Sequence, residues 1–215
     1  MPLTRINAVN AISGTIPAAH VDNTTVANIT ALPSAVETGA LTLISTHTAS
    51  DDASVSITSG IDSTYDSYVF KFIDIHPETD NSSFQFQCST DSGSTYGVTV
   101  TTTYFRAQHN ESDSNTSLTY LTTDDLAQST SFITISEDVG ADNDQAVSGT
   151  LQLFQPSSTT FVKHFINNFS GNQFNNFSFN EFMAGYFNDT NDIDAIRFKF
   201  ASGNMNGTIK MYGVS

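Results

Sequence analysis

The sequence has no tryptophan, a single cysteine, and only 7 basic residues against 22 acidic ones. With one thiol, Cys88, the chain can form no internal disulfide and no metal site built from cysteines. The formal net charge of −15 repels phosphate groups, which disfavours nucleic acid and anionic lipid as partners. Cys88 alternates with Phe84 and Phe86, and this predicts a buried structural thiol rather than a nucleophile.

Long apolar runs are also missing. No stretch reaches the roughly 20 residues of a membrane-spanning helix. The opening residues, Met1 to Arg5, lack the basic and apolar regions of a signal peptide. We therefore expect no membrane insertion.

Aromatic residues are absent from the first part of the chain, since residues 1–64 contain none and Tyr65 is the first. This segment consists of small and β-branched residues interrupted by prolines, so it cannot bury enough surface to offset its ordering entropy. We predict an extended arm over residues 1–39 that docks on a partner, followed by a folded domain over residues 40–215. The arm residues predicted in that contact are Ile12, Ile16 and Pro17.

Phe and Tyr, by contrast, are plentiful, at 17 and 7 residues. They alternate with other side chains, as in residues 68–73 and 84–88, with the period of two that is typical of β-strands. Strands are predicted at residues 41–46, 54–57, 68–73, 84–88, 98–105, 117–121, 132–135, 149–154, 160–166, 176–182, 196–200 and 208–212. Short strands without a long amphipathic helix predict an all-β, antiparallel β-sandwich of the jelly-roll kind.

The connections are rich in turn-forming residues. Residues 89–96 predict a tight turn that makes a hairpin of the strands on either side of it. Residues 107–130 are polar and acidic, and they predict a long surface excursion with one short strand. A second exposed acidic loop is expected at residues 137–145.

Reactive groups do not converge in the sequence. The five histidines lie in separate segments, and no Gly-x-Ser-x-Gly motif occurs. We therefore predict no catalytic residue, no cofactor and no metal ligand, and a protein that is not an enzyme. Two alternatives stay open: clustered loop carboxylates that cleave a glycan, and a loose calcium site at residues 189–194.

Phenylalanine and asparagine interleave densely over residues 161–187. One core can take many of these rings, but Phe169 and Phe174 fall where the strand pattern is irregular. We predict that these two rings lie in an interface between subunits or with a partner. The alternative is that all of the rings belong to the core of one chain.

Two segments resemble virion proteins of marine and freshwater tailed phages. Residues 59–96 are similar to an N-terminal half found in those proteins. Residues 196–214 are similar to their closing hairpin, in which two strands flank a Ser-Gly-Asn turn and end near Tyr-Gly. Residues 13–19 are similar to connector segments of phage fibres. The resemblance extends over about residues 40–215.

The resemblance implies a non-catalytic part of the virion exterior that forms a homo-oligomer, often a trimer, and contacts other virion proteins of the capsid or tail. A capsid decoration or cement subunit is the first expectation. The alternative is a tail-fibre or receptor-binding protein for host attachment, with a host surface glycan as a further partner. A carbohydrate-binding sandwich module and a glycan-cleaving enzyme are the other classes considered.

Overall fold

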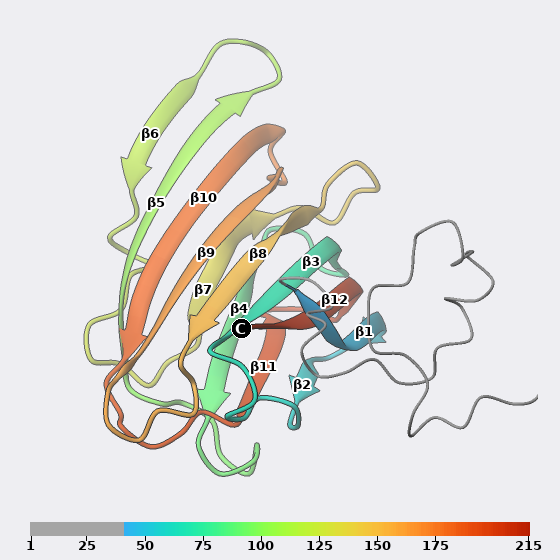
Figure 1. The fold of residues 1–215 in the computed structure, drawn as a ribbon. Coiled ribbons are helices and arrows are strands. Elements are labelled where there is room, and N and C mark those ends of the chain that lie inside the picture. The colour runs from blue at the N-terminus through green and yellow to red at the C-terminus, as the bar shows by residue number, and fades with distance from the viewer. Residues whose placement is uncertain (1–40) are drawn as a thin grey trace, which may run out of the picture. The chain divides into compact units, whose positions relative to one another are not determined.

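Twelve strands in two antiparallel sheets make up residues 41–215, the part of the chain that the computed structural model describes (Figure 1). The larger sheet has the order β1 (Thr42–Asp52), β12 (Met205–Val214), β3 (Ser67–Pro77), β8 (Val147–Phe154), β9 (Lys163–Asn172), β10 (Phe177–Phe187), β5 (Val100–Asn110), β6 (Thr116–Tyr120). The smaller sheet has the order β2 (Val55–Ile57), β11 (Ala195–Phe200), β4 (Ser82–Ser89), β7 (Ile133–Val139). The predicted antiparallel β-sandwich is confirmed. The predicted arm over residues 1–39, with Ile12, Ile16 and Pro17, lies outside the described residues.

Eight of the strands follow jelly-roll topology. These strands are, in chain order, β1, β2, β3, β4, β7, β8, β11 and β12. The first pairs with the last, the second with the second-last, and so on: β1 with β12, β2 with β11, β3 with β8, and β4 with β7. These pairs alternate between the two sheets, as expected for one long antiparallel ribbon rolled up on itself. The fold is therefore a jelly roll.

The other four strands extend one sheet of this jelly roll. Strands β5 and β6 are inserted between β4 and β7, and β9 and β10 between β8 and β11. Strand β9 adds to the edge of β8, and β10, β5 and β6 follow in turn. In Figure 1 they form the left-hand part of the large sheet. Half of this sheet thus belongs to the jelly roll and half to the extension.

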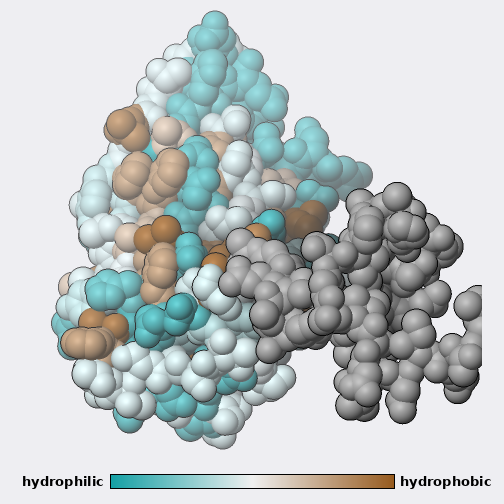
Figure 2. All heavy atoms as spheres, in the orientation of Figure 1, coloured by the Kyte–Doolittle hydropathy of each residue, from teal (hydrophilic) through white to brown (hydrophobic). Residues whose placement is uncertain are grey.

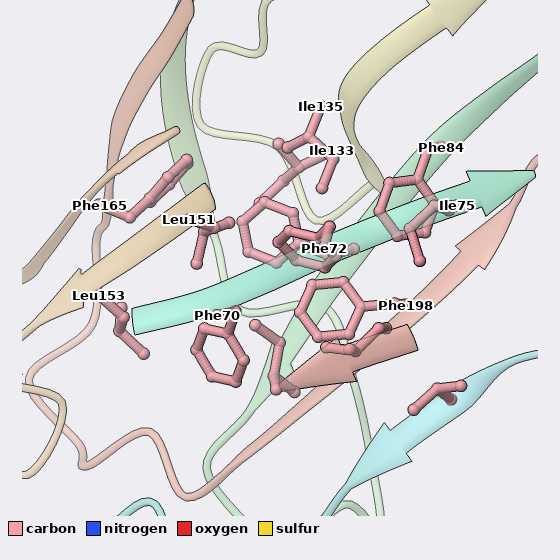
Figure 3. Close-up of a cluster of buried hydrophobic side chains, with 14 of the residues drawn as sticks. Phe70, Phe72, Ile75, Phe84, Ile133, Ile135, Leu151, Leu153, Phe165 and Phe198 are labelled. Carbon is pink, nitrogen blue, oxygen red and sulfur yellow. The ribbon is translucent and has the colours of Figure 1, made fainter. Parts of the chain in front are cut away.

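Phenylalanine rings from both sheets fill the core between them. Phe72 of β3 is 2% exposed, and its ring centroid lies 5.5 Å from Phe84, 5.1 Å from Phe198 and 5.1 Å from Phe169. Figure 3 shows Phe72 between Phe84 and Phe198, whose strands belong to the smaller sheet. Alternation in the sequence places these rings, because every second side chain of a strand points to the same face. Cys88 also lies in this core, fully buried as predicted.

Two predicted hairpins are wrong. Strands β4 and β5, on either side of residues 89–96, lie in different sheets, as do β11 and β12, on either side of residues 201–204. Both edges of β4 are taken by β11 and β7, so no edge is left for the strand that follows. Consecutive strands of a jelly roll cross between its sheets, which a turn signal by itself does not reveal.

Candidate functional site

Phe169, predicted to lie in an interface, is instead a core residue. Strand β9 continues to Asn172, so Phe169 falls on the same inward face as Phe165. Its exposed fraction is 0%, and its ring lies 5.1 Å from Phe72 and 6.1 Å from Phe84. The interface prediction is wrong for this residue, because the strand is longer than the sequence pattern indicated.

Phe174 lies in the connection between β9 and β10 and is 37% exposed. Its backbone N–H donates to the carbonyl oxygen of Asp138 at 3.0 Å, which ties the connection to β7. Its ring is accessible, so its predicted role in a partner contact stays a prediction.

A group of exposed rings occupies the outer face of the sheet extension, the face turned away from the small sheet. Phe105 of β5 pairs directly with Phe182 of β10, and the two rings stack with centroids 5.1 Å apart at an interplanar angle of 13°. They are 43% and 40% exposed. Tyr120 of β6 pairs with Phe105 from the other side. Figure 2 shows hydrophobic side chains gathered over β5, β10 and β9.

A groove of about 430 Å³ lies beside these rings. Outward side chains of β8, β9 and β10 form its floor: Asn168 pairs with both Phe182 and Thr150, and Ile166 pairs with Gln152. The lining residues are Val69, Thr103, Phe105, Thr150, Gln152, Ile166, Asn167, Asn168, Phe182, Met183 and Ala184. None of them carries a charge. The groove therefore combines aromatic and aliphatic surface with amide and hydroxyl groups.

Sequence reasoning missed this groove, although a signal was present. Phe105 directly follows Tyr104, and in a strand two consecutive rings must point to opposite faces. Tyr104 is buried, so Phe105 has to lie on the solvent side. Both faces of this half of the large sheet carry rings for that reason.

A larger hollow of about 670 Å³ lies on the same sheet, lined mostly by polar side chains of β3, β8 and β9 and of the loop at residues 143–146. Its His76 ring nitrogen is 2.8 Å from the carbonyl oxygen of Ala141. The backbone N–H of its Asp74 donates to the Ser148 hydroxyl at 3.0 Å. These groups are held by hydrogen bonds within the protein, and the hollow offers an open polar surface.

On the inner side of the extension lies a buried cluster of charges. Arg106 of β5 forms an ion pair with Glu137 at 2.6 Å, and its guanidinium lies 3.4 Å from Asp138 and 3.6 Å from Glu181. The side chain of Glu181 is 1% exposed. One cation thus faces three carboxylates, of which Glu137 and Glu181 are largely or fully buried and Asp138 is 40% exposed.

Burial raises the pKa of Glu181 to about 7, against the pull of hydrogen-bonding neighbours and of Arg106. The pKa of Glu137 is raised as well, mainly by burial and further by the nearby Asp124. Paired carboxylates with raised pKa values can act as acid and base. Here, however, Glu181 is closed off from solvent, and the Arg106 guanidinium lies against both carboxylates.

This cluster predicts that stability falls as the pH rises. The unfolded chain releases the Glu181 proton near its ordinary pKa of 4.5, whereas the folded protein holds it until about pH 7. The unfolded state therefore binds fewer protons across that window, and Glu181 alone should lower the free energy of unfolding by about 3 kcal/mol between pH 4.5 and pH 8. Urea denaturation at several pH values measures this. In Glu181→Gln the same pH dependence should be clearly weaker, and an equal slope would contradict the assignment.

The acidic segment at residues 189–194, considered for calcium, surrounds a lysine. Lys163 is fully buried, and its ammonium donates to the carbonyl oxygens of Asp189, at 3.2 Å, and of Asn191. The carboxylate of Asp194 accepts the backbone N–H of Ser92 at 2.9 Å. Among residues 41–215, no group of three or more His, Cys, Asp or Glu side chains is placed to hold a metal ion. Backbone oxygens of this segment thus bind an internal ammonium.

Comparison with known proteins finds no family model, no curated protein and no solved structure that matches the chain. Within the described residues no helix is long and apolar enough to cross a membrane. The class that the structure defines is a jelly-roll β-sandwich with a four-strand extension of one sheet.

Proposed function

We propose that this chain is a non-enzymatic structural protein of the exterior of a tailed-phage virion. The first candidate role is that of an oligomeric capsid decoration subunit, docked on the capsid through residues 1–39. The proposal rests on the resemblance of residues 59–96 and 196–214 to phage virion proteins, and on the jelly-roll fold, which is frequent among viral surface proteins. The Ser-Gly-Asn turn of that resemblance joins the two sheets in this fold.

The observation that carries a contact function is the sheet extension. Its four strands extend the large sheet beyond the jelly roll, and they turn stacked aromatic rings towards solvent. Exposed apolar surface of this kind is typical of interaction sites. The two carboxylates best suited to catalysis, Glu137 and Glu181, are held by Arg106 inside the protein.

Immunogold labelling of intact particles of a phage that encodes this chain tests the proposal. Gold distributed over the capsid supports the decoration role, and gold at the tail supports host attachment. Particles that carry neither label nor peptide of the chain, in a lysate where the protein is abundant, would overturn both. Light scattering of the purified protein tests the predicted trimer.

Removing residues 1–39 separates docking from folding. Residues Gly39–Ser215 form a compact unit of their own, so the truncated protein should keep the melting temperature of the full chain within a few degrees. Its incorporation into particles, followed by immunoblotting of purified virions, should be lost. Full incorporation of the truncated protein, or loss of its cooperative unfolding, would disprove the docking arm.

Host attachment is the second candidate role, and the outer groove favours it. A decoration subunit needs contacts with its own capsid, whereas an attachment protein must present a recognition surface to solvent. The groove beside Phe105 and Phe182 is open and uncharged, and its mainly aromatic and aliphatic surface includes a few amide and hydroxyl groups. Those are properties of a surface that recognises a neutral ligand with both apolar and hydroxyl-bearing faces.

A further inference from the structure

We infer that the outer groove of the sheet extension is a binding site for a neutral oligosaccharide. The inference deepens the host-attachment role just proposed and rests on it for its biological meaning. Its physical basis is independent of any location in a particle. It stands on the side chains that meet at strands β8, β9 and β10.

The first element of the site is an aromatic platform. Phe182 lies in a cross-strand row between Phe105 and Asn168, and 40% of its surface is exposed. Its stacking with Phe105 holds the ring upright without any contribution from a ligand. Sugar rings have an apolar face of C–H groups, and an exposed, immobile aromatic ring binds such a face by dispersion and by removal of water.

The second element is a pair of amides that are already oriented. Asn168 Nδ2 donates to Asn180 Oδ1 and to the carbonyl oxygen of Glu181, both at 3.2 Å. Gln152 Nε2 donates to the Ser67 hydroxyl at 3.1 Å. Each amide nitrogen is thus anchored by the protein, which leaves the amide oxygen as an acceptor for hydroxyl groups in the groove. Such preorganisation lowers the entropic cost of binding.

Charge selects the kind of sugar. No charged side chain lines the groove, and the chain as a whole carries a net charge of −15, which opposes anionic glycans. The basic residue nearest in the row, Lys71, pairs with Thr150 across β3 and β8. Its ammonium lies over the Tyr212 ring, 5.2 Å from the centroid, and so is already engaged. The ligand that fits is uncharged.

The dimensions suit a short chain rather than a single sugar. From Phe105 to Thr150 the row crosses from β5 through β10 and β9 to β8, which is three inter-strand steps, or about 14 Å. That length accommodates about three sugar rings.

Calorimetry of the purified full-length protein with a panel of trisaccharides tests the site. The panel consists of neutral trimers of glucose, mannose, galactose and N-acetylglucosamine, with a trimer of glucuronic acid as the charged comparison. At least one neutral trimer should bind with a Kd in the millimolar range or tighter, and more strongly than the uronic acid trimer. Failure of every neutral trimer at about 10 mM, where such affinities are measurable, overturns the inference.

Variants of the protein locate the binding. Phe182→Ala should weaken binding at least tenfold, and Gln152→Leu several-fold. Phe161→Ala removes a ring that is 73% exposed and lies outside the groove, so it should bind as the unchanged protein does. Equal affinity in Phe182→Ala and Phe161→Ala would overturn the site. So would a Phe182→Ala variant that loses self-association while no sugar binds, since the groove would then be a subunit contact.

These outcomes differ from those of the particle experiments. If the protein binds a neutral trimer and the gold label lies on the capsid, the sugar site in the groove is supported and the host-attachment role is contradicted. If the gold label lies on the tail and the protein binds no neutral trimer, the host-attachment role is supported and the sugar site in the groove is contradicted.

Discussion

Phe72→Ala is expected to lower the free energy of unfolding by about 3–5 kcal/mol, as observed for buried phenylalanines whose cavity cannot collapse. Phe72 lies within 5.5 Å, centroid to centroid, of three other rings, from β4, β9 and β11. These strands belong to both sheets. The surrounding rings are held by their own strands, so they cannot move into the space that the substitution leaves.

Chemical denaturation, monitored by circular dichroism, measures this loss. Phe161→Ala serves as the matched control, because it removes the same side chain from a position that is 73% exposed. The control should stay within about 0.5 kcal/mol of the unchanged protein. A loss below 1 kcal/mol for Phe72→Ala would mean that the two sheets do not pack through this ring.

Arg106→Leu is the second substitution with a large expected effect. It leaves Glu137 and Glu181 without the cation that faces them at 2.6 and 3.6 Å. Breaking a buried ion pair from one side costs about 3–5 kcal/mol, and this loss is expected above about pH 9, where both carboxyl groups of the unchanged protein are ionised. Near pH 5 the loss should be much smaller, because burial raises the pKa of both carboxyl groups and they are then neutral.

The test is a comparison of Arg106→Leu with a triple variant in which Glu137 and Glu181 are also replaced by leucine. Removing all of these charges should restore most of the lost stability, since apolar replacements of a buried ion cluster are often neutral or stabilising. A triple variant less stable than Arg106→Leu alone would show that the carboxyl groups serve the fold without their cation.

The strands were predicted from the alternation of aromatic or apolar side chains with polar ones along the sequence. Each predicted strand overlaps one in the structure, and several are longer than predicted. Strand β9 was expected to end at residue 166 and ends at Asn172. Its second half contains Asn and Ser, which occur on a solvated sheet face but carry little strand signal. The shortened prediction is what left Phe169 outside the core.

The pairing of strands was not accessible in the same way. A turn reports the conformation of a few residues, whereas the partner of a strand depends on segments far away in the chain. Strand β3 pairs with β12 and β8, each more than 60 residues along the chain. The sequence also did not predict the buried charges. Glu181 and Arg106 have the pattern of ordinary solvated residues, and only the strand register places them opposite each other.

The outer groove is a consequence of this hidden pairing. Its floor joins β8, β9 and β10, and the ring of Phe105 comes from β5, which belongs to a separate insertion. Local sequence describes each strand but gives no indication that the two insertions meet. Their meeting places both rings in one row.

The position of β12 in the middle of the jelly-roll half has a consequence for synthesis. This last strand lies between β1 and β3, and it is the only strand of residues 41–215 that joins the two. A chain still emerging from the ribosome therefore holds two hydrogen-bonding edges open until Val214 is available. Contacts between segments that are distant in the chain form slowly, and the unpaired strand edges are prone to aggregation until these contacts form. The net charge of −15 opposes association of neighbouring copies through these edges.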